Sequence, residues 1–108
     1  MNISIIADDY AVVAQILPNE VVEIAADGFH AIICNRPDNE EPGQPSASEI
    51  AAECEKAGIA FHHIPVSGVP IAVESIEEQR RIIDASEGPV LAYCRSGQRS
   101  IIIWQASA

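Results

Sequence analysis

Short apolar runs alternate with amphipathic segments along the whole chain, and turn-forming residues separate them. Two runs near the start, Ile3–Ala7 and Tyr10–Ala14, predict a pair of short strands joined by a turn at Asp8 and Asp9. Later apolar runs predict further strands at His30–Asn35, Ala60–Val66 and Pro89–Tyr93.

Helix start and stop signals lie between these strands. Pro18 begins a short helix that ends at Gly28. The segment Ser46–Glu49 matches a capping box, in which a serine hydroxyl and a glutamate carboxylate each accept a backbone N–H. The helix that follows this box ends at Gly58.

The second half of the chain repeats this pattern. A second capping box, at Ser75–Glu78, predicts a helix that stops before Gly88. The last helix carries Ile101–Trp104 and is apolar on nearly every face, so we expect it at the centre of the fold. Between the third strand and the second helix, the segment Arg36–Pro45 contains three prolines and a glycine and predicts a long loop.

The order of elements predicts the fold class. Strands and helices alternate after Pro18, an order that favours right-handed crossovers and a mostly parallel sheet with helices on both faces. We therefore expect an α/β fold with a central sheet of about four to five strands. With 108 residues, 48% of them hydrophobic, the chain has enough material for one core, so residues 1–108 are predicted to form a single domain.

Charge and hydropathy exclude several classes of function. Sixteen acidic residues against six basic ones give a net charge of -10, which argues against binding to nucleic acid or to anionic membranes. No apolar run approaches the ~20 residues of a membrane span. The start of the chain has no secretion signal, so we expect a cytoplasmic protein whose three cysteines are free thiols.

The segment Cys94–Ser100, between a predicted strand and a predicted helix, contains the residues best suited to catalysis. A helix N-terminus lowers the pKa of a thiol from its usual value of about 8.5, which makes Cys94 the candidate nucleophile. Gly97 allows the loop to curl so that backbone N–H groups form an anion-binding nest. Arg99 offers a planar fork for two oxygens of an anion. The candidate catalytic residues are Cys94 and Arg99, and the candidate anion-binding residues are Arg95, Ser96, Gly97, Gln98 and Ser100.

Within this loop the side chains are expected to differ in role. The backbone of Arg95 suffices for the nest, so its side chain is expected to lean outward and attract anionic substrates. The Ser100 hydroxyl is a candidate to hydrogen-bond the sulfur or a departing group. A cysteine, a glycine and an arginine at this spacing after a strand are far more specific than a lone buried cysteine.

Together, these motifs resemble a known family. The segments Ile32–Asp38, Glu41–Gln44, Phe61–Val66 and Ala92–Gly97 are similar to the phosphatase-like domain of the beta-lactamase-hydrolase-like family. The resemblance covers nearly the whole chain and implies a cysteine-phosphatase-like fold of the dual-specificity type, with one anion-binding cysteine loop. Members of the family are described both as phosphatases and as sulfurtransferases, and the domain can be fused to a sulfur-oxidising hydrolase.

Two departures from the phosphatase pattern favour sulfur transfer. Four residues separate Cys94 from Arg99, which is the length of the rhodanese loop, whereas phosphatases of this fold have one residue more. No carboxylate follows the Ile-Pro-Val strand until Glu74, so the usual general acid is missing. Tyr93 also replaces the usual histidine. We therefore expect a rhodanese-type sulfurtransferase that needs no cofactor and carries a persulfide on Cys94, with thiosulfate or a small persulfide as donor and a thiol as acceptor.

Two alternatives stay open beside sulfur transfer. The first is a cysteine-dependent phosphatase of phosphate monoesters, for which Asp38, Glu40, Glu41 or Glu74 would have to supply the acid. The second is a non-catalytic module that binds an anion or a persulfide.

The remaining reactive side chains are weaker candidates. Cys34 is expected near the Cys94 strand, where it could resolve a disulfide or relay sulfur, but a small buried side chain is the simpler interpretation. Arg36 could add a second cation near the site, and a solvated or salt-bridged arginine explains it equally well. Cys54 lies on the apolar stripe of its helix and is expected to be structural. His62 and His63 face opposite sides of a strand, so no metal site is predicted.

Overall fold

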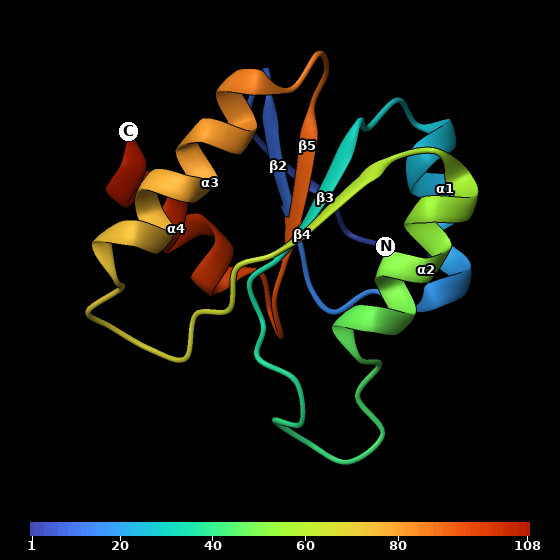
Figure 1. Ribbon diagram of the computed structural model, residues 1–108, viewed down its shortest axis with the longest axis horizontal. Coiled ribbons are helices and arrows are strands. Elements are labelled where there is room, and N and C mark those ends of the chain that lie inside the picture. The colour runs from blue at the N-terminus through green and yellow to red at the C-terminus, as the bar shows by residue number, and fades with distance from the viewer.

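A five-stranded sheet forms the centre of the molecule, and the computed structural model describes all residues, 1–108 (Figure 1). The spatial order is β1-β2-β5-β3-β4, and every neighbouring pair is parallel except β1 with β2. This arrangement confirms the α/β class and the mostly parallel sheet. The strands are β1 (Ser4–Ala7), β2 (Tyr10–Val13), β3 (Ala31–Cys34), β4 (Ala60–His63) and β5 (Val90–Tyr93).

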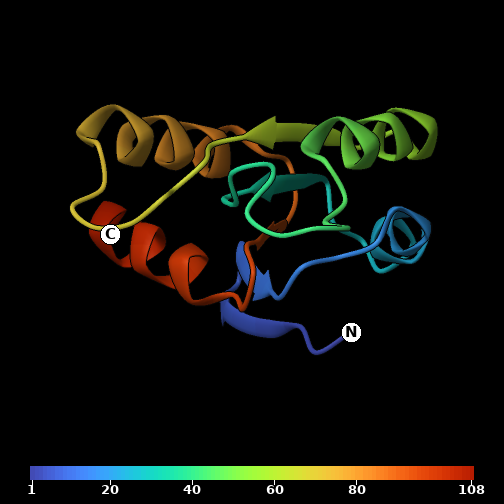
Figure 2. The ribbon, with the colours of Figure 1, turned by 90° about the horizontal axis from the view of Figure 1, so that it is seen from below.

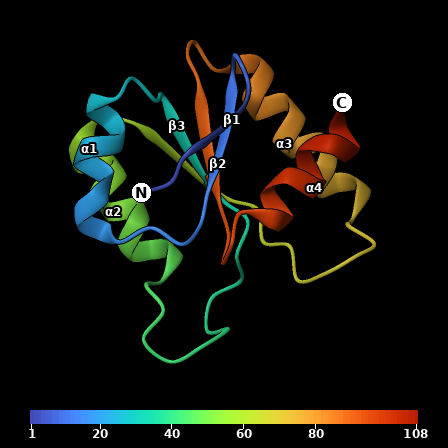
Figure 3. The ribbon, with the colours of Figure 1, turned by 180° about the vertical axis from the view of Figure 1, so that it is seen from behind.

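Helices cover both faces of the sheet, as Figures 1 and 3 show. Side chains alternate along β5, so Leu91 and Tyr93 enter one core while Val90 and Ala92 enter the other. The first core lies under α1 and α2, and the second lies under α3 and α4. The helices are η1 (Pro18–Glu20, a 3-10 turn), α1 (Val21–Ala26), α2 (Ala47–Ala57), α3 (Val73–Ala85) and α4 (Gln98–Ser107). None of them has the length and apolar character needed to cross a membrane.

The two predicted capping boxes have different outcomes. Ser46 caps α2, because its hydroxyl accepts the backbone N–H of Glu49 at 3.2 Å. The second box is wrong: α3 already begins at Val73, and its N-cap residue Ala72 has no side-chain cap. Ser75 therefore lies inside the first turn, where its backbone N–H is already bonded to the carbonyl of Ala72.

The prediction that the last helix is central is also wrong. In α4 only Ser100 and Ile103 are buried, because the helix packs against the sheet and against α3 while its remaining surface is open. Ile101 and Trp104 are half-buried, and the Trp104 ring stacks on Tyr10 at a centroid distance of 5.9 Å. Because α4 lies beside α3 on one face of the sheet, its apolar residues need one covered face rather than full burial.

The parallel strands end at one level, and this alignment builds the site. Tyr93 of β5 is in register with Val13 of β2 and with Cys34 of β3. The residues that follow these strands therefore meet at one edge, which Figure 2 views directly. In that view the Pro-rich loop 36–45 crosses the middle of the edge.

β4 is shorter than predicted at this edge. Its ladder stops at His63, although the backbone N–H groups of Ile64 and Val66 still bond to the carbonyls of Cys34 and Asn35.

Candidate functional site

The cysteine loop connects the end of β5 to the start of α4. Cys94 has no solvent-exposed surface, and the backbone N–H of Gly97 donates to its sulfur at 3.1 Å. Gly97 has a φ of 96°, in the left-handed region that only glycine enters without strain, and it directly precedes the first helical residue, Gln98. The glycine thus turns the backbone N–H groups of the loop inward.

This loop activates the Cys94 thiol. Burial alone would raise its pKa, but the backbone N–H groups directed at the sulfur outweigh that effect and lower the pKa below its ordinary value. These N–H groups belong to Ser100, Gly97, Arg99 and Ser96. The loop therefore stabilises negative charge at this point, whether on a thiolate or on a bound oxyanion.

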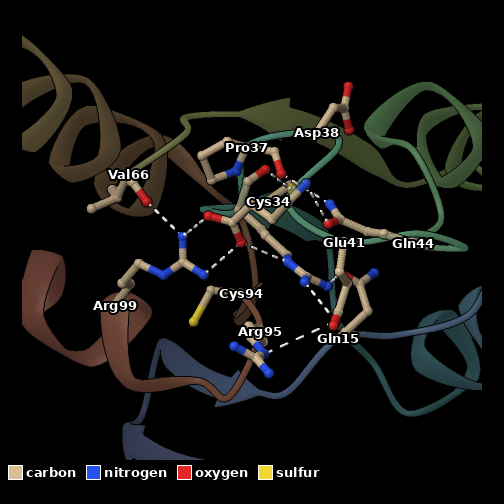
Figure 4. A network of polar contacts seen from close by, with 12 residues as sticks. Gln15, Cys34, Pro37, Asp38, Glu41, Gln44, Val66, Cys94, Arg95 and Arg99 are labelled. Carbon is tan, nitrogen blue, oxygen red and sulfur yellow. Dashed lines mark hydrogen bonds and ion pairs between the residues drawn. The ribbon is translucent and has the colours of Figure 1, made fainter. Parts of the chain in front are cut away.

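Arg99 lies beside the sulfur, and hydrogen bonds to Glu40 and to the Val66 carbonyl hold its guanidinium in place. Its Nη1 donates to the Val66 carbonyl and to Glu40 Oε2, each at 2.8 Å, and its Nη2 donates to Glu40 Oε1 at 2.9 Å. Of the five N–H donors of a guanidinium, Nε–H and one Nη2–H remain outside these bonds. In Figure 4 the edge formed by Nε and Nη2 is turned toward the sulfur of Cys94.

A second arginine, Arg36, is the first residue of the Pro-rich loop, and its side chain is buried. Arg36 is only 1% exposed, and its guanidinium donates to Gln15 at 3.0 Å and to Glu40 and Glu41 at 2.8 Å each. Glu40 thus accepts hydrogen bonds from both Arg99 and Arg36, and these bonds lower the pKa of its carboxyl group to about 2. Arg36, a candidate cation for the site, is therefore paired with carboxylates and is linked to Arg99 through their shared partner Glu40.

The other polar residues of the loop have different surroundings. The Arg95 side chain is 70% exposed and lies 4.0 Å from Glu41. The Ser96 hydroxyl accepts the backbone N–H of Gln98 at 3.3 Å. The hydroxyl of Ser100 donates to Asn35 instead of the sulfur, so Ser100 contributes to the nest through its backbone.

A buried polar network packs beneath the cysteine loop, and no motif in the sequence indicated it. Asn35 Oδ1 accepts the Ser100 hydroxyl at 2.9 Å, and Asn35 Nδ2 donates to Gln79 at 2.8 Å and to the Ile64 carbonyl at 3.0 Å. Gln79 then donates to the Tyr10 hydroxyl, which donates to the Ser100 carbonyl at 2.7 Å. The signal available in the sequence was a glutamine facing the apolar side of a helix.

The other two cysteines are not activated. Cys34 packs in the same core as Tyr93, on the α1–α2 side of the sheet, and its thiol donates to the Arg36 carbonyl at 3.3 Å. Burial raises the pKa of Cys34, and it raises the pKa of Cys54 to about 11. Both side chains are therefore protonated at neutral pH and are part of the packing.

A surface hollow lies away from this loop. It has a volume of about 490 Å³ and is lined by residues of β4 and α3 and by the start of β3 with the preceding His30. No cluster of three or more histidine, cysteine or acidic side chains suited to a metal ion occurs in the chain. The candidate nucleophile, the candidate cation and the nest occur together at the Cys94 edge.

Comparisons with known proteins agree with this geometry. The model of the phosphatase-like domain of beta-lactamase hydrolase-like proteins matches residues 2–108. A beta-lactamase hydrolase-like protein of Xylella fastidiosa is 36% identical over 107 residues, which are 99% of this chain and 25% of that protein. The chain thus spans about a quarter of the length of this relative.

Two solved structures extend the comparison. A protein of Neisseria meningitidis, provisionally named a phosphatase, is 39% identical with a TM-score of 0.86, over 96% of this chain and 74% of that one. The active form of Tk-PTP is 29% identical with a TM-score of 0.67, over 88% of this chain and 63% of that one. Both carry the fold described above.

The prediction of a sulfurtransferase is wrong. The matched family is phosphatase-like, and so are the solved structures that share this fold. The prediction relied on the short spacing between Cys94 and Arg99, which was expected to leave too narrow a cradle for a phosphoryl group. With this spacing the loop still turns the N–H groups of four residues toward the sulfur and presents two donors of Arg99 beside it. The inference from loop length is therefore overturned by the family and by the solved structures.

Proposed function

Because this chain belongs to the family of phosphatase-like domains of beta-lactamase hydrolase-like proteins, we propose that it is a cysteine-dependent phosphatase of phosphate monoesters. The observation that carries the proposal is the convergence of three groups at one point. These groups are the Cys94 sulfur, the inward-turned N–H groups of its loop, and the two unused donors of Arg99. A tetrahedral anion with three terminal oxygens needs this set of donors around a nucleophile.

The proposed reaction has two steps. The Cys94 thiolate attacks phosphorus, an S–P bond forms, and the ester P–O bond breaks, so the alcohol leaves as its oxyanion. Water then attacks phosphorus, the S–P bond breaks, and inorganic phosphate and the thiolate are released. The proton that water loses goes to solvent, where it balances the proton taken up by the departing oxyanion.

The leaving group determines which esters react well. No carboxylate lies between Val66 and Glu74, and the carboxyl group of Glu40, with a pKa of about 2, is ionised at neutral pH. A missing general acid costs roughly 10²–10⁴-fold in rate when the leaving group is basic. We therefore expect aryl phosphates, whose oxyanions need little protonation, to be hydrolysed faster than alkyl phosphates.

Hydrolysis of p-nitrophenyl phosphate by the purified chain tests the proposal. Rapid acid quenching during turnover should trap one phosphoryl group per chain, and peptide mapping should place it on Cys94. Cys54→Ala, which changes a buried cysteine of α2, is the matched control and should retain both turnover and trapping. Absence of aryl phosphate hydrolysis together with absence of trapped phosphoryl group would refute the proposal.

A further inference from the structure

We propose that Glu40 is a positioning residue that holds Arg99 so that its Nε–Nη2 edge faces the anion-binding loop. The inference rests on the proposed function only in taking that loop as the place where an anionic substrate binds. According to this inference, the Pro-rich loop, which is far from Cys94 in sequence, sets the orientation in which the Arg99 guanidinium binds that substrate.

The first argument is the division of the Arg99 donors. Glu40 contacts both Nη atoms, and the Val66 carbonyl takes the second proton of Nη1. A carboxylate that meets both Nη atoms occupies the outer edge of a guanidinium and leaves the adjacent edge, Nε with Nη2, available for a second bidentate partner. Since this free edge is turned toward Cys94, Glu40 and a bound oxyanion occupy different sides of the same group.

The second argument is that Glu40 itself is anchored. Its Oε1 accepts from Arg36 Nε at 2.8 Å, and Arg36 is fully buried with a further bond to Gln15. Gln44 braces the loop, because its amide oxygen accepts the Glu40 backbone N–H and its amide nitrogen donates to the Pro37 carbonyl. A carboxylate fixed by a buried arginine and a braced backbone gives Arg99 one defined orientation.

A competing role for Glu40 makes the opposite prediction. If Glu40 merely blocked Arg99 as an internal anion, its removal would strengthen the binding of anions, because one negative charge near the site is lost. If it positions Arg99, its removal weakens the binding of anions although the site becomes less negative. The sign of the change therefore decides between the two roles.

The rates at which two reagents alkylate Cys94 show whether removal of Glu40 strengthens or weakens the binding of an anion, and they need no phosphatase assay. Iodoacetate is an anion that can use the Arg99 edge, whereas iodoacetamide is neutral and reports the reactivity of the thiolate and access to it. We expect Glu40→Gln to slow alkylation of Cys94 by iodoacetate about tenfold. Alkylation by iodoacetamide should change by less than about twofold, because the backbone groups that activate the thiol remain.

Glu41→Gln is the matched control. It removes the same charge from the neighbouring residue, which bonds Arg36 but makes no bond to Arg99. We expect both alkylation rates in this variant to stay within about twofold of the unmodified protein. Glu40→Asp provides a second variant that keeps the charge but shortens the side chain by one methylene, and it should slow iodoacetate selectively as well.

A double-mutant cycle with Arg99→Lys tests whether Glu40 acts through Arg99. In the Arg99→Lys background, Glu40→Gln should no longer change the iodoacetate rate, since the fork that it orients is absent. Faster reaction with iodoacetate in Glu40→Gln, an equal loss with both reagents, or additive losses in the cycle would each overturn the inference. Because no ester is hydrolysed in these experiments, a protein without phosphatase activity could still show the pattern, and an active phosphatase could fail to show it.

Discussion

Glu40 and Arg99 are 59 positions apart in the chain and form a bidentate ion pair, with N–O distances of 2.8 and 2.9 Å. The pair joins the Pro-rich loop after β3 to the first turn of α4. Both side chains are largely covered, with exposed fractions of 28% for Glu40 and 21% for Arg99. An ion pair in this setting is screened less by solvent than a surface pair, so it holds the Pro-rich loop against the first turn of α4.

Replacement of the nucleophile should abolish turnover without unfolding the protein. Cys94→Ser replaces a thiolate by a hydroxyl that no adjacent base activates, so hydrolysis of p-nitrophenyl phosphate should fall to background. The circular dichroism spectrum and the midpoint of thermal unfolding should stay close to those of Cys54→Ser, in which a buried cysteine of α2 is changed in the same way. Substantial turnover in Cys94→Ser would show that another residue is the nucleophile.

The two arginines of the loop should contribute unequally to substrate binding. Arg99→Lys keeps the charge but loses the planar fork, which we expect to weaken substrate binding by about 1–3 kcal/mol and to raise KM accordingly. Arg95→Ala removes a side chain that is 70% exposed, so a change below about 1 kcal/mol is expected. Steady-state kinetics on an aryl phosphate measures both effects, and equal losses would contradict the assigned roles.

The fold could be predicted from the sequence largely because its signals are local. Apolar runs bounded by glycine and proline marked the strands to within a few residues, and the order of elements indicated a mostly parallel sheet. The position of α4 could not be predicted in this way, because its apolar residues do not reveal which face another helix will cover. The start of α3 was misplaced for a related reason, because the Ser75 box lies two residues after the true start at Val73, where no side chain caps the helix.

In the candidate site, too, local features could be predicted and long-range contacts could not. Cys94, Gly97 and Arg99 lie within one loop and carry a recognisable spacing. By contrast, the contacts of Arg99 with Glu40 and of Ser100 with Asn35 join residues 59 and 65 positions apart. Such contacts depend on the register of β3 with β5, which places the ends of both strands at one edge. Hydrophobic pattern and spacing do not determine this register.

Stability in acid should depend on Glu40. Hydrogen bonds from Arg99 and Arg36 lower the pKa of its carboxyl group from 4.5 to about 2. A carboxyl group with a lowered pKa in the folded state stabilises the protein above its unfolded-state pKa. That stabilisation is lost as the pH falls through the window from 4.5 to about 2. The free energy of unfolding of Glu40→Gln should therefore fall less steeply in this window than that of the unmodified protein.

Urea unfolding at a series of pH values measures this slope. Glu77→Gln removes an exposed carboxylate inside α3 that forms no ion pair and is the matched control, so its slope should follow the unmodified protein. Identical slopes for Glu40→Gln and the unmodified protein would show that the ion pairs of Glu40 do not persist in solution.

Interruption of the buried network under the loop should lower the free energy of unfolding. Asn35→Ala leaves the Ser100 hydroxyl, the Gln79 amide and the Ile64 carbonyl without their shared partner, in a region where Asn35, Gln79 and Ser100 have no exposed surface. Each unpaired buried group costs about 1–3 kcal/mol, so the free energy of unfolding should fall by at least about 2 kcal/mol. Lys56→Ala breaks an exposed pair with Glu53 and should cost less than about 0.5 kcal/mol.

The same variant should also affect the nucleophile, because Asn35 holds Ser100 and the backbone N–H of Ser100 faces the Cys94 sulfur. A loosened loop gives the thiolate weaker hydrogen bonds, so the pKa of Cys94 should rise in Asn35→Ala. The pH profile of alkylation by iodoacetamide measures this rise as a shift of its midpoint to higher pH. The profile is recorded under conditions in which the variant remains folded. Lys56→Ala should leave the midpoint unchanged. An unshifted midpoint in Asn35→Ala, combined with the expected loss of stability, would mean that the network supports the fold without tuning the thiol.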